Sequence, residues 1–119
     1  MTDNYRRDIQ ELLDDRFADD PRVMSGLMFG HPGYKREGRV FCFVYDDGLT
    51  IKLSKADYAA CLELEEARTF SPRGTPMGTW VVLTYADAPK YLDNWGWIEK
   101  ALAYIVTDAA APPKKKKKR

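Results

Sequence analysis

Apolar residues recur along the first twenty positions with the period of a helix. The apolar positions in this segment are Tyr5, Ile9, Leu12, Leu13 and Phe17. They form one stripe of a 3.6-residue repeat, and acidic residues fill the opposite side. The pattern predicts an amphipathic helix with Thr2 or Asp3 as its N-cap. Asp20-Pro21 ends this helix, because the residue before a proline avoids the helical conformation.

From residue 23 onwards, short extended segments alternate with turn residues. Val23–Met28 predicts a strand, and Tyr34–Arg36 predicts a second extended segment. The expected turns are Gly30-His31-Pro32-Gly33 and, closing a tight hairpin, Glu37-Gly38. Several strands joined by such short turns favour antiparallel pairing.

Arg39–Tyr45 has the clearest strand pattern in the chain. Val40, Cys42 and Val44 alternate with Phe41, Phe43 and Tyr45, so both sets are apolar. Such a segment is typical of a central strand covered on both faces. Asp46-Asp47-Gly48 predicts a hairpin turn into Leu49–Leu53, whose alternation predicts a half-buried strand.

The second half of the chain predicts a helix, a loop, a strand and a last helix. Ser54 is the expected N-cap of the first, with Asp57 as its capping-box partner, and its apolar stripe is Tyr58, Cys61, Leu62 and Glu65. Phe70–Gly78 is a loop rich in proline and glycine, and Thr79–Tyr85 is a buried strand. Asp87 caps the last helix, with Pro89 in its first turn. The apolar positions of that helix are Leu92, Trp95, Ile98, Leu102 and Ile105.

These elements predict an α+β domain: an antiparallel sheet of hairpins with an N-terminal, a middle and a C-terminal helix packed on it. The 119 residues suffice for one domain, which we place at residues 1–108. Residues 109–119 are expected to be an Ala/Pro linker and a disordered basic tail. No apolar run reaches the ~20 residues of a membrane span. Two cysteines within apolar stretches are typical of a cytoplasmic protein, so we expect that location and no membrane.

The charge of the chain is divided between two unlike parts. The last six residues are all basic: Lys114, Lys115, Lys116, Lys117, Lys118 and Arg119. The rest holds 13 Lys and Arg against 18 Asp and Glu, a net charge of −5. A basic block of this kind favours contact with phosphate backbones, without sequence readout. It is also similar to a nuclear-import signal, and its alternative is a solubilising terminus without a partner.

Several short strings together resemble a known family. They are Met28-Phe29-Gly30, Gly33-Tyr34, Gly38-Arg39-Val40-Phe41, Ile51-Lys52-Leu53, Gly74-x-Pro76-Met77 and Trp80. In this order they resemble the TfoX/Sxy N-terminal domain, over roughly residues 8–107. The resemblance implies an α+β regulatory module that works with a DNA-bound transcription factor, although the second domain of the two-domain members is missing here. The runner-up resemblance is to the MmcQ/YjbR-like family, which implies a DNA-binding double-wing fold.

The titratable residues do not form a catalytic pattern. His31 is the single histidine, and its sequence neighbours are glycine and proline, which favours a turn or packing role. Together with Cys42 and Cys61 it lacks the spacing of a metal site. The acidic pairs fit turns and solvated helix faces. We therefore expect no catalytic residues, no cofactor and no metal.

Two other features are candidate contact sites. Loops on rigid scaffolds often carry binding, so Arg73, Gly74 and Met77 of the Phe70–Gly78 loop are candidates for contact with a ligand or partner. Trp97 lies off the apolar stripe of the last helix. It is therefore either packed at the edge of the core or exposed as an interface residue.

The leading hypothesis is a non-enzymatic regulatory module that contacts a transcription-related protein partner, as a monomer or weak homodimer. The basic tail would add nonspecific attraction to nucleic acid. One alternative is direct DNA binding by a basic face of the folded domain, formed by Arg22, Lys35, Arg36, Arg39 and Lys52. The other is an enzyme that uses a pocket near Phe29–Tyr34 and the Arg73 loop.

Overall fold

Three two-residue turns fold the first four strands into a continuous antiparallel meander. In the computed structural model, which describes residues 5–110, these strands are β1 (Met24–Met28), β2 (His31–Arg36), β3 (Arg39–Tyr45) and β4 (Gly48–Lys52). Phe29-Gly30 and Glu37-Gly38 both have positive φ angles at the two central positions, as a type I′ turn requires. The turn at Asp46-Asp47 has a positive φ at Asp46. The α+β class and antiparallel sheet expected from the sequence are therefore confirmed.

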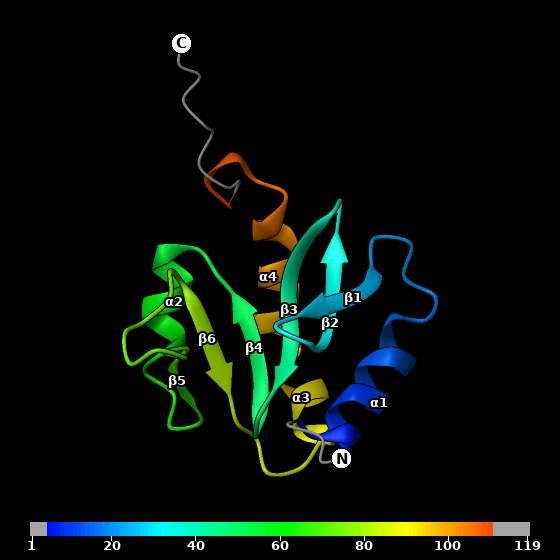
Figure 1. The fold of residues 1–119 in the computed structure, drawn as a ribbon, viewed down its shortest axis with the longest axis horizontal. Coiled ribbons are helices and arrows are strands. Elements are labelled where there is room, and N and C mark those ends of the chain that lie inside the picture. The colour runs from blue at the N-terminus through cyan, green and yellow to red at the C-terminus, as the bar shows by residue number, and fades with distance from the viewer. Residues whose placement is uncertain (1–4, 111–119) are drawn as a thin grey trace.

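The remaining elements complete a six-stranded sheet and its cover. They are α1 (Arg7–Phe17), α2 (Lys55–Cys61), β5 (Ala67–Thr69), β6 (Trp80–Leu83), α3 (Pro89–Asp93), α4 (Gly96–Ile105) and a 3₁₀ turn at Asp108–Ala110. The strand order is β1-β2-β3-β4-β6-β5, and every neighbouring pair is antiparallel. Figure 1 shows α4 crossing behind β3 and β4, with α1 near the β1–β2 end of the sheet.

The two faces of the sheet are covered differently. On one face, α1 and α4 pack into the main core, where Ile9, Leu13 and Ile98 meet sheet residues such as Val44 and Leu83. The other face carries a smaller core. Its buried members are Phe43, Phe70, Trp80 and Val82. Within residues 5–110, no helix contributes to this smaller core. The residues that follow β5 cover it instead, so this face depends on a loop.

The turn expected at Gly30-His31-Pro32-Gly33 is wrong. The turn is Phe29-Gly30, and β2 begins at His31. β2 pairs with β3 only from Gly33 onwards, so the missing N–H of Pro32 removes no bond from the ladder. Pro32 can therefore lie near the start of a strand, although the sequence pattern predicted a turn at this position.

A bulge in β3 changes which of its side chains share a face. Tyr34 is opposite Cys42 whereas Lys35 is opposite Val40, so Phe41 is an extra residue. Phe41 and Cys42 consequently both enter the main core, while Phe43 and Tyr45 lie on the other face. The expected central position of this strand is confirmed, but the strict alternation from Val40 to Tyr45 is wrong.

The strand β4 is more deeply buried than its alternation predicts. Thr50 lies between Phe43 and Val82 in the sheet and is fully buried. Its hydroxyl has no hydrogen-bond partner within the described residues. The half-buried prediction is wrong because the smaller core covers the face that the polar residue was expected to present to solvent.

The expected last helix is two helices. A turn at Asn94-Trp95 separates α3 from α4, and the Asn94 side chain donates a hydrogen bond to the Lys90 carbonyl at 2.9 Å. The break changes the buried face: Tyr91 is buried, while Leu92 is 42% exposed rather than part of the core. Asp87 is not the cap, since the N-cap of α3 is Ala88, which makes no side-chain cap bond. Pro89 does lie in the first turn, as expected.

The other helix ends agree only in part with the sequence pattern. Ser54 accepts a hydrogen bond from the Asp57 N–H at 3.2 Å, which confirms it as the cap of α2. That helix ends at Cys61, so Glu65 is not on it, and the short strand β5 was not expected. Helix α1 ends at Phe17, three residues before Asp20, and its expected caps lie outside the described residues. Ala110 is buried, so the packed part of the chain extends to at least residue 110.

Candidate ligand groove and the pocket beneath the edge strand

An open groove lies where the β1–β2 turn meets the loop between β5 and β6. Its volume is about 670 Å³. The lining residues are Phe29, His31, Tyr45, Pro72, Arg73, Thr75, Pro76 and Met77. Apolar and aromatic side chains predominate among them, and a cavity of this size and character is typical of ligand sites.

Backbone hydrogen bonds hold the loop in place. The Met77 N–H donates to the Phe70 carbonyl at 2.9 Å, and the Gly74 N–H donates to the Ser71 carbonyl at 3.1 Å. Gly74 has a φ of 90°, which a residue with a side chain rarely adopts. Phe70 anchors the loop, since its buried ring packs edge-on against Tyr45 at 5.0 Å between centroids. The wall of the groove is thus fixed by the small core beneath it.

Phe29 stands at the junction of the turn and the groove. It is 58% exposed and has a φ of 54°, a conformation that favours Asn, Asp or Gly. Its ring contacts Phe43 and Phe70 at about 6 Å between centroids. An exposed aromatic residue lowers solubility, and a positive φ angle at a residue with a side chain costs backbone energy. Such strained positions are concentrated at functional sites.

His31 is held by its neighbours rather than by a catalytic partner. Its Nδ1 lies 2.9 Å from the Phe29 carbonyl oxygen, which can only accept a hydrogen bond, so Nδ1 is the donor in this contact. The ring packs against Tyr45 at 4.9 Å between centroids. Its Nε2 is buried and has no partner in the part of the chain that the structure describes. None of the described residues that line the groove is Ser, Cys, Asp or Glu.

The thiols and acids elsewhere do not add a reactive centre to this groove. Cys42 and Cys61 are both buried and not disulfide-bonded. Burial raises the pKa of the Cys61 thiol to about 12 and that of Cys42 well above its usual value, which keeps both protonated and unreactive. Within residues 5–110, no three His, Cys, Asp or Glu residues lie close enough together to hold a metal ion.

The structure brings together only part of the residues singled out in the sequence. Arg73 and Met77 line the groove, and Gly74 shapes the loop between them. Trp97 is half-buried and packs against the main core, as in the edge-packing alternative. Residues 114–119 lie outside the described residues. Phe29 and His31 belong to the Phe29–Tyr34 segment that the enzyme alternative placed beside the Arg73 loop, whereas Tyr45 was not expected at the groove.

Among the five basic residues considered for a DNA-binding face, the three arginines are engaged within the molecule. Arg36 donates to the Leu102 carbonyl at 2.9 Å, and Arg39 donates to that of Ile105 at 2.7 Å, so both bind the last turn of α4. Arg22 pairs with Asp20 and Glu99. Lys52 lies over the Trp80 ring at 5.7 Å. The Lys35 side chain lies along Gly26.

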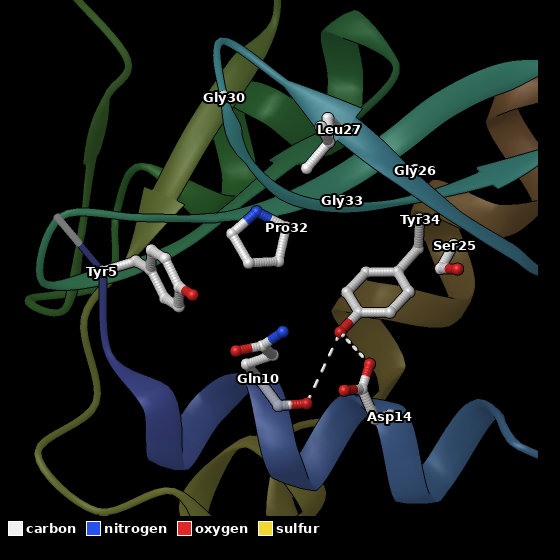
Figure 2. A pocket seen from close by; sticks show the side chains of 10 residues that line it. All are labelled: Tyr5, Gln10, Asp14, Ser25, Gly26, Leu27, Gly30, Pro32, Gly33 and Tyr34. Atoms are coloured by element: carbon white, nitrogen blue, oxygen red, sulfur yellow. Dashed lines mark hydrogen bonds between the residues drawn. The ribbon is translucent and has the colours of Figure 1, made fainter. Parts of the chain in front are cut away.

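A second, smaller pocket lies between α1 and the β1–β2 hairpin. Its volume is about 350 Å³, and Figure 2 shows its lining residues. The Tyr34 ring descends from β2 toward the helix, where its hydroxyl donates to an Asp14 carboxylate oxygen at 2.7 Å. Burial and the nearby Asp14 carboxylate raise the pKa of Tyr34 above its usual value, so this hydroxyl remains a donor. Because Tyr34 points toward α1 while His31 lines the groove, the two side chains lie on opposite faces of the sheet.

Comparisons with family models, curated proteins and solved structures found no match to this chain. No helix in the described range, residues 5–110, has the length and apolar character needed to cross a membrane.

Proposed function

We propose that this protein is a non-enzymatic protein-interaction module that holds an apolar segment of a partner in the groove beside Phe29. The observation that carries the proposal is the composition of the groove: aromatic, proline and methionine surfaces with one cation, Arg73, at the rim. A hydrophobic centre with a polar rim is the usual anatomy of a protein-binding surface.

The charge of the groove defines the partner more closely. Arg73 is exposed, and no carboxylate lines the groove among the described residues. A partner segment that combines an aliphatic or aromatic side chain with an adjacent Asp or Glu matches both features. The carboxylate meets the guanidinium, while the apolar side chain covers Phe29 and Tyr45.

A regulatory role of the TfoX N-terminal type is part of the same proposal. It rests on the strings around Phe29, Val40 and Trp80 and on the α+β antiparallel architecture. In this proposal the basic tail, residues 114–119, adds nonspecific contact with nucleic acid close to the protein partner. Direct DNA binding by the folded surface has less support, because Arg22, Arg36 and Arg39 are engaged within the molecule.

Selection from a random peptide library tests the groove. We expect the enriched peptides to share an apolar residue beside an acid. Fluorescence anisotropy of one such peptide is then expected to show at least a tenfold loss of affinity in Arg73→Glu. Lys90→Glu is the matched control, because Lys90 is an exposed cation on α3 outside the groove lining. Equal binding to wild type and Arg73→Glu, or no enrichment, would contradict the proposal.

The tail is tested separately on duplex DNA across a salt series. The full chain is compared with a full-length variant whose last six residues are serine. We expect the slope of log affinity against log salt to become shallower by about 5 when the six cations are lost. An unchanged slope would place nucleic-acid binding on the folded domain instead, and so favour the double-wing alternative.

A further inference from the structure

The outer edge of β1 lacks the features that normally protect a sheet edge. From Val23 to Phe29 the sequence holds no charged residue and no proline, and β1 pairs with β2 without a bulge. Met24 and Leu27 are 70% and 71% exposed. The opposite edge strand, β5, has three residues, and its Arg68 is paired with Asp47. Of the two sheet edges in the described part of the chain, the β1 edge is thus the longer one and the neutral, apolar one.

The hydrogen-bond pattern shows what this edge offers. Met28 and His31 flank the two-residue turn and close the ladder between β1 and β2. In an antiparallel ladder, residues alternate between bonded and non-bonded pairs. The N–H and C=O groups of Ser25 and Leu27 therefore point away from β2, and an added strand can pair with them.

The pocket beneath this edge supplies a position for one side chain of an added strand. Ser25 and Leu27 form part of its lining from the sheet side, and Asp14 faces them from α1 (Figure 2). Asp14 is the one charged residue among the described residues that line the pocket. Tyr34 donates to one of its oxygens, which leaves the other for a donor from outside. The pocket therefore favours a cation.

The other face of the edge carries the opposite charge. A side chain at Gly26 would meet the Lys35 side chain, so Lys35 covers β1 on the face away from α1. Neighbouring residues of an added strand point to opposite faces. A segment with a Lys or Arg next to an Asp or Glu therefore matches Asp14 on one face and Lys35 on the other.

We propose that β1 is a docking site for an extended segment of another protein, which adds a seventh strand to the sheet and places a basic side chain against Asp14. Backbone pairing supplies affinity in this mode, and the pocket supplies specificity. The charges favour a different protein over a second copy. A second β1 brings no cation to Asp14 and would place two Lys35 side chains near each other.

A labelled, capped peptide of sequence Thr-Val-Thr-Glu-Arg-Ile-Thr serves as the probe, and anisotropy against the full chain measures its affinity. We expect Asp14→Lys to weaken binding at least tenfold. Asp15→Lys is the matched control, with the same charge change on an exposed neighbour outside the pocket, and its affinity should stay within twofold. Asp14→Lys should in turn bind a peptide with glutamate in place of the arginine at least tenfold more tightly than wild type does.

Ser25→Pro tests the backbone pairing independently of charge. Its N–H points outward, so proline leaves the β1–β2 ladder intact but blocks an added strand. We expect the probe to lose binding while the circular dichroism spectrum is retained. Three outcomes would overturn the proposal: no binding of the probe, equal effects of Asp14→Lys and Asp15→Lys, or concentration-dependent self-association that Ser25→Pro abolishes. The last would make a second copy the occupant. None of these variants alters the groove beside Phe29.

Discussion

At the scale of single residues, Phe29 occupies a turn position that its backbone conformation disfavours but that places its ring beside the groove. A type I′ turn favours Asn-Gly, and the chain has Phe-Gly with a φ of 54° at Phe29. The aromatic ring recovers part of that cost by packing against Phe43 and Phe70, but the residue remains 58% exposed and lines the groove. A turn chosen for stability alone would not carry this residue.

Phe29→Asn is expected to separate binding from stability. Relief of the left-handed strain, worth about 1–2 kcal/mol, roughly offsets the lost packing of a ring that is half buried. The free energy of unfolding in urea should therefore change by less than about 1 kcal/mol. Affinity for a groove-selected peptide should fall at least tenfold. A large loss of stability together with unchanged affinity would show that Phe29 is a packing residue.

At the scale of elements, two arginines on the β2–β3 hairpin fix the end of α4. Arg39 donates to the carbonyls of Ile105 and Thr107 at 2.7 and 3.2 Å, and Arg36 donates to that of Leu102. The last carbonyls of a helix lack a donor one turn further on, and a cation near them also complements the helix dipole. Thr107 follows α4, and its carbonyl also accepts a hydrogen bond from the Ala110 N–H at 3.2 Å. These hydrogen bonds join the β2–β3 hairpin to the C-terminal end of α4.

Arg39→Met is expected to lower the free energy of unfolding by about 1–2 kcal/mol, because two hydrogen bonds to a charged donor are lost. Arg73→Met is the matched control, since Arg73 is exposed in a loop, and its effect should stay below about 0.5 kcal/mol. Urea unfolding followed by tryptophan fluorescence measures both. Equal effects of the two substitutions would show that the contacts of Arg39 with α4 contribute nothing to stability.

At the scale of the whole molecule, the stability of the fold is expected to fall at both alkaline and acidic pH. Burial raises the pKa of Tyr91 and Cys61 to about 12 each, and those of Tyr34 and Cys42 are raised as well. In the unfolded chain these groups titrate near 10 for tyrosine and 9 for cysteine. Their contribution is thus complete below pH 9 and is lost as the pH rises toward 12.

Exposed acids give a weaker dependence at low pH. Hydrogen bonds from Arg22 lower the pKa of Asp20 to about 2, and arginine partners also lower those of Asp8 and Asp47. Stability from these pairs is present above about pH 4 and is lost as the pH falls toward 2. Because solvent screens exposed pairs, the acid limb should be shallower than the alkaline one.

Tyrosinate absorbance at 295 nm measures the alkaline limb. Of the seven tyrosines, Tyr34 and Tyr91 are expected to titrate only when the fold is lost, and the urea midpoint should fall steadily between pH 9 and 11. Titration of all seven near pH 10 with an unchanged circular dichroism spectrum would contradict this expectation.

The sequence by itself determined the fold class and several of the local elements. The Arg39–Tyr45 strand, the turns at Glu37-Gly38 and Asp46-Asp47, and the Ser54 cap agree with the structure because each depends on neighbours in the chain. The Phe70–Gly78 loop was likewise expected, and with it Arg73 as a contact candidate. These are the features that backbone conformational preference decides.

Only the tertiary structure decided which surfaces meet. The β3 bulge moved Phe41 to the face of Cys42, and the break after α3 turned Leu92 outward. Neither feature can be predicted from the periodicity of apolar residues along the sequence, because each depends on packing between distant parts of the chain. The groove was assembled in the same way, from the turn at Phe29, the end of β3 and a loop that begins more than forty residues after that turn. The pocket between Asp14 and β1 was assembled likewise. Burial against distant residues, rather than local preference, places these side chains together.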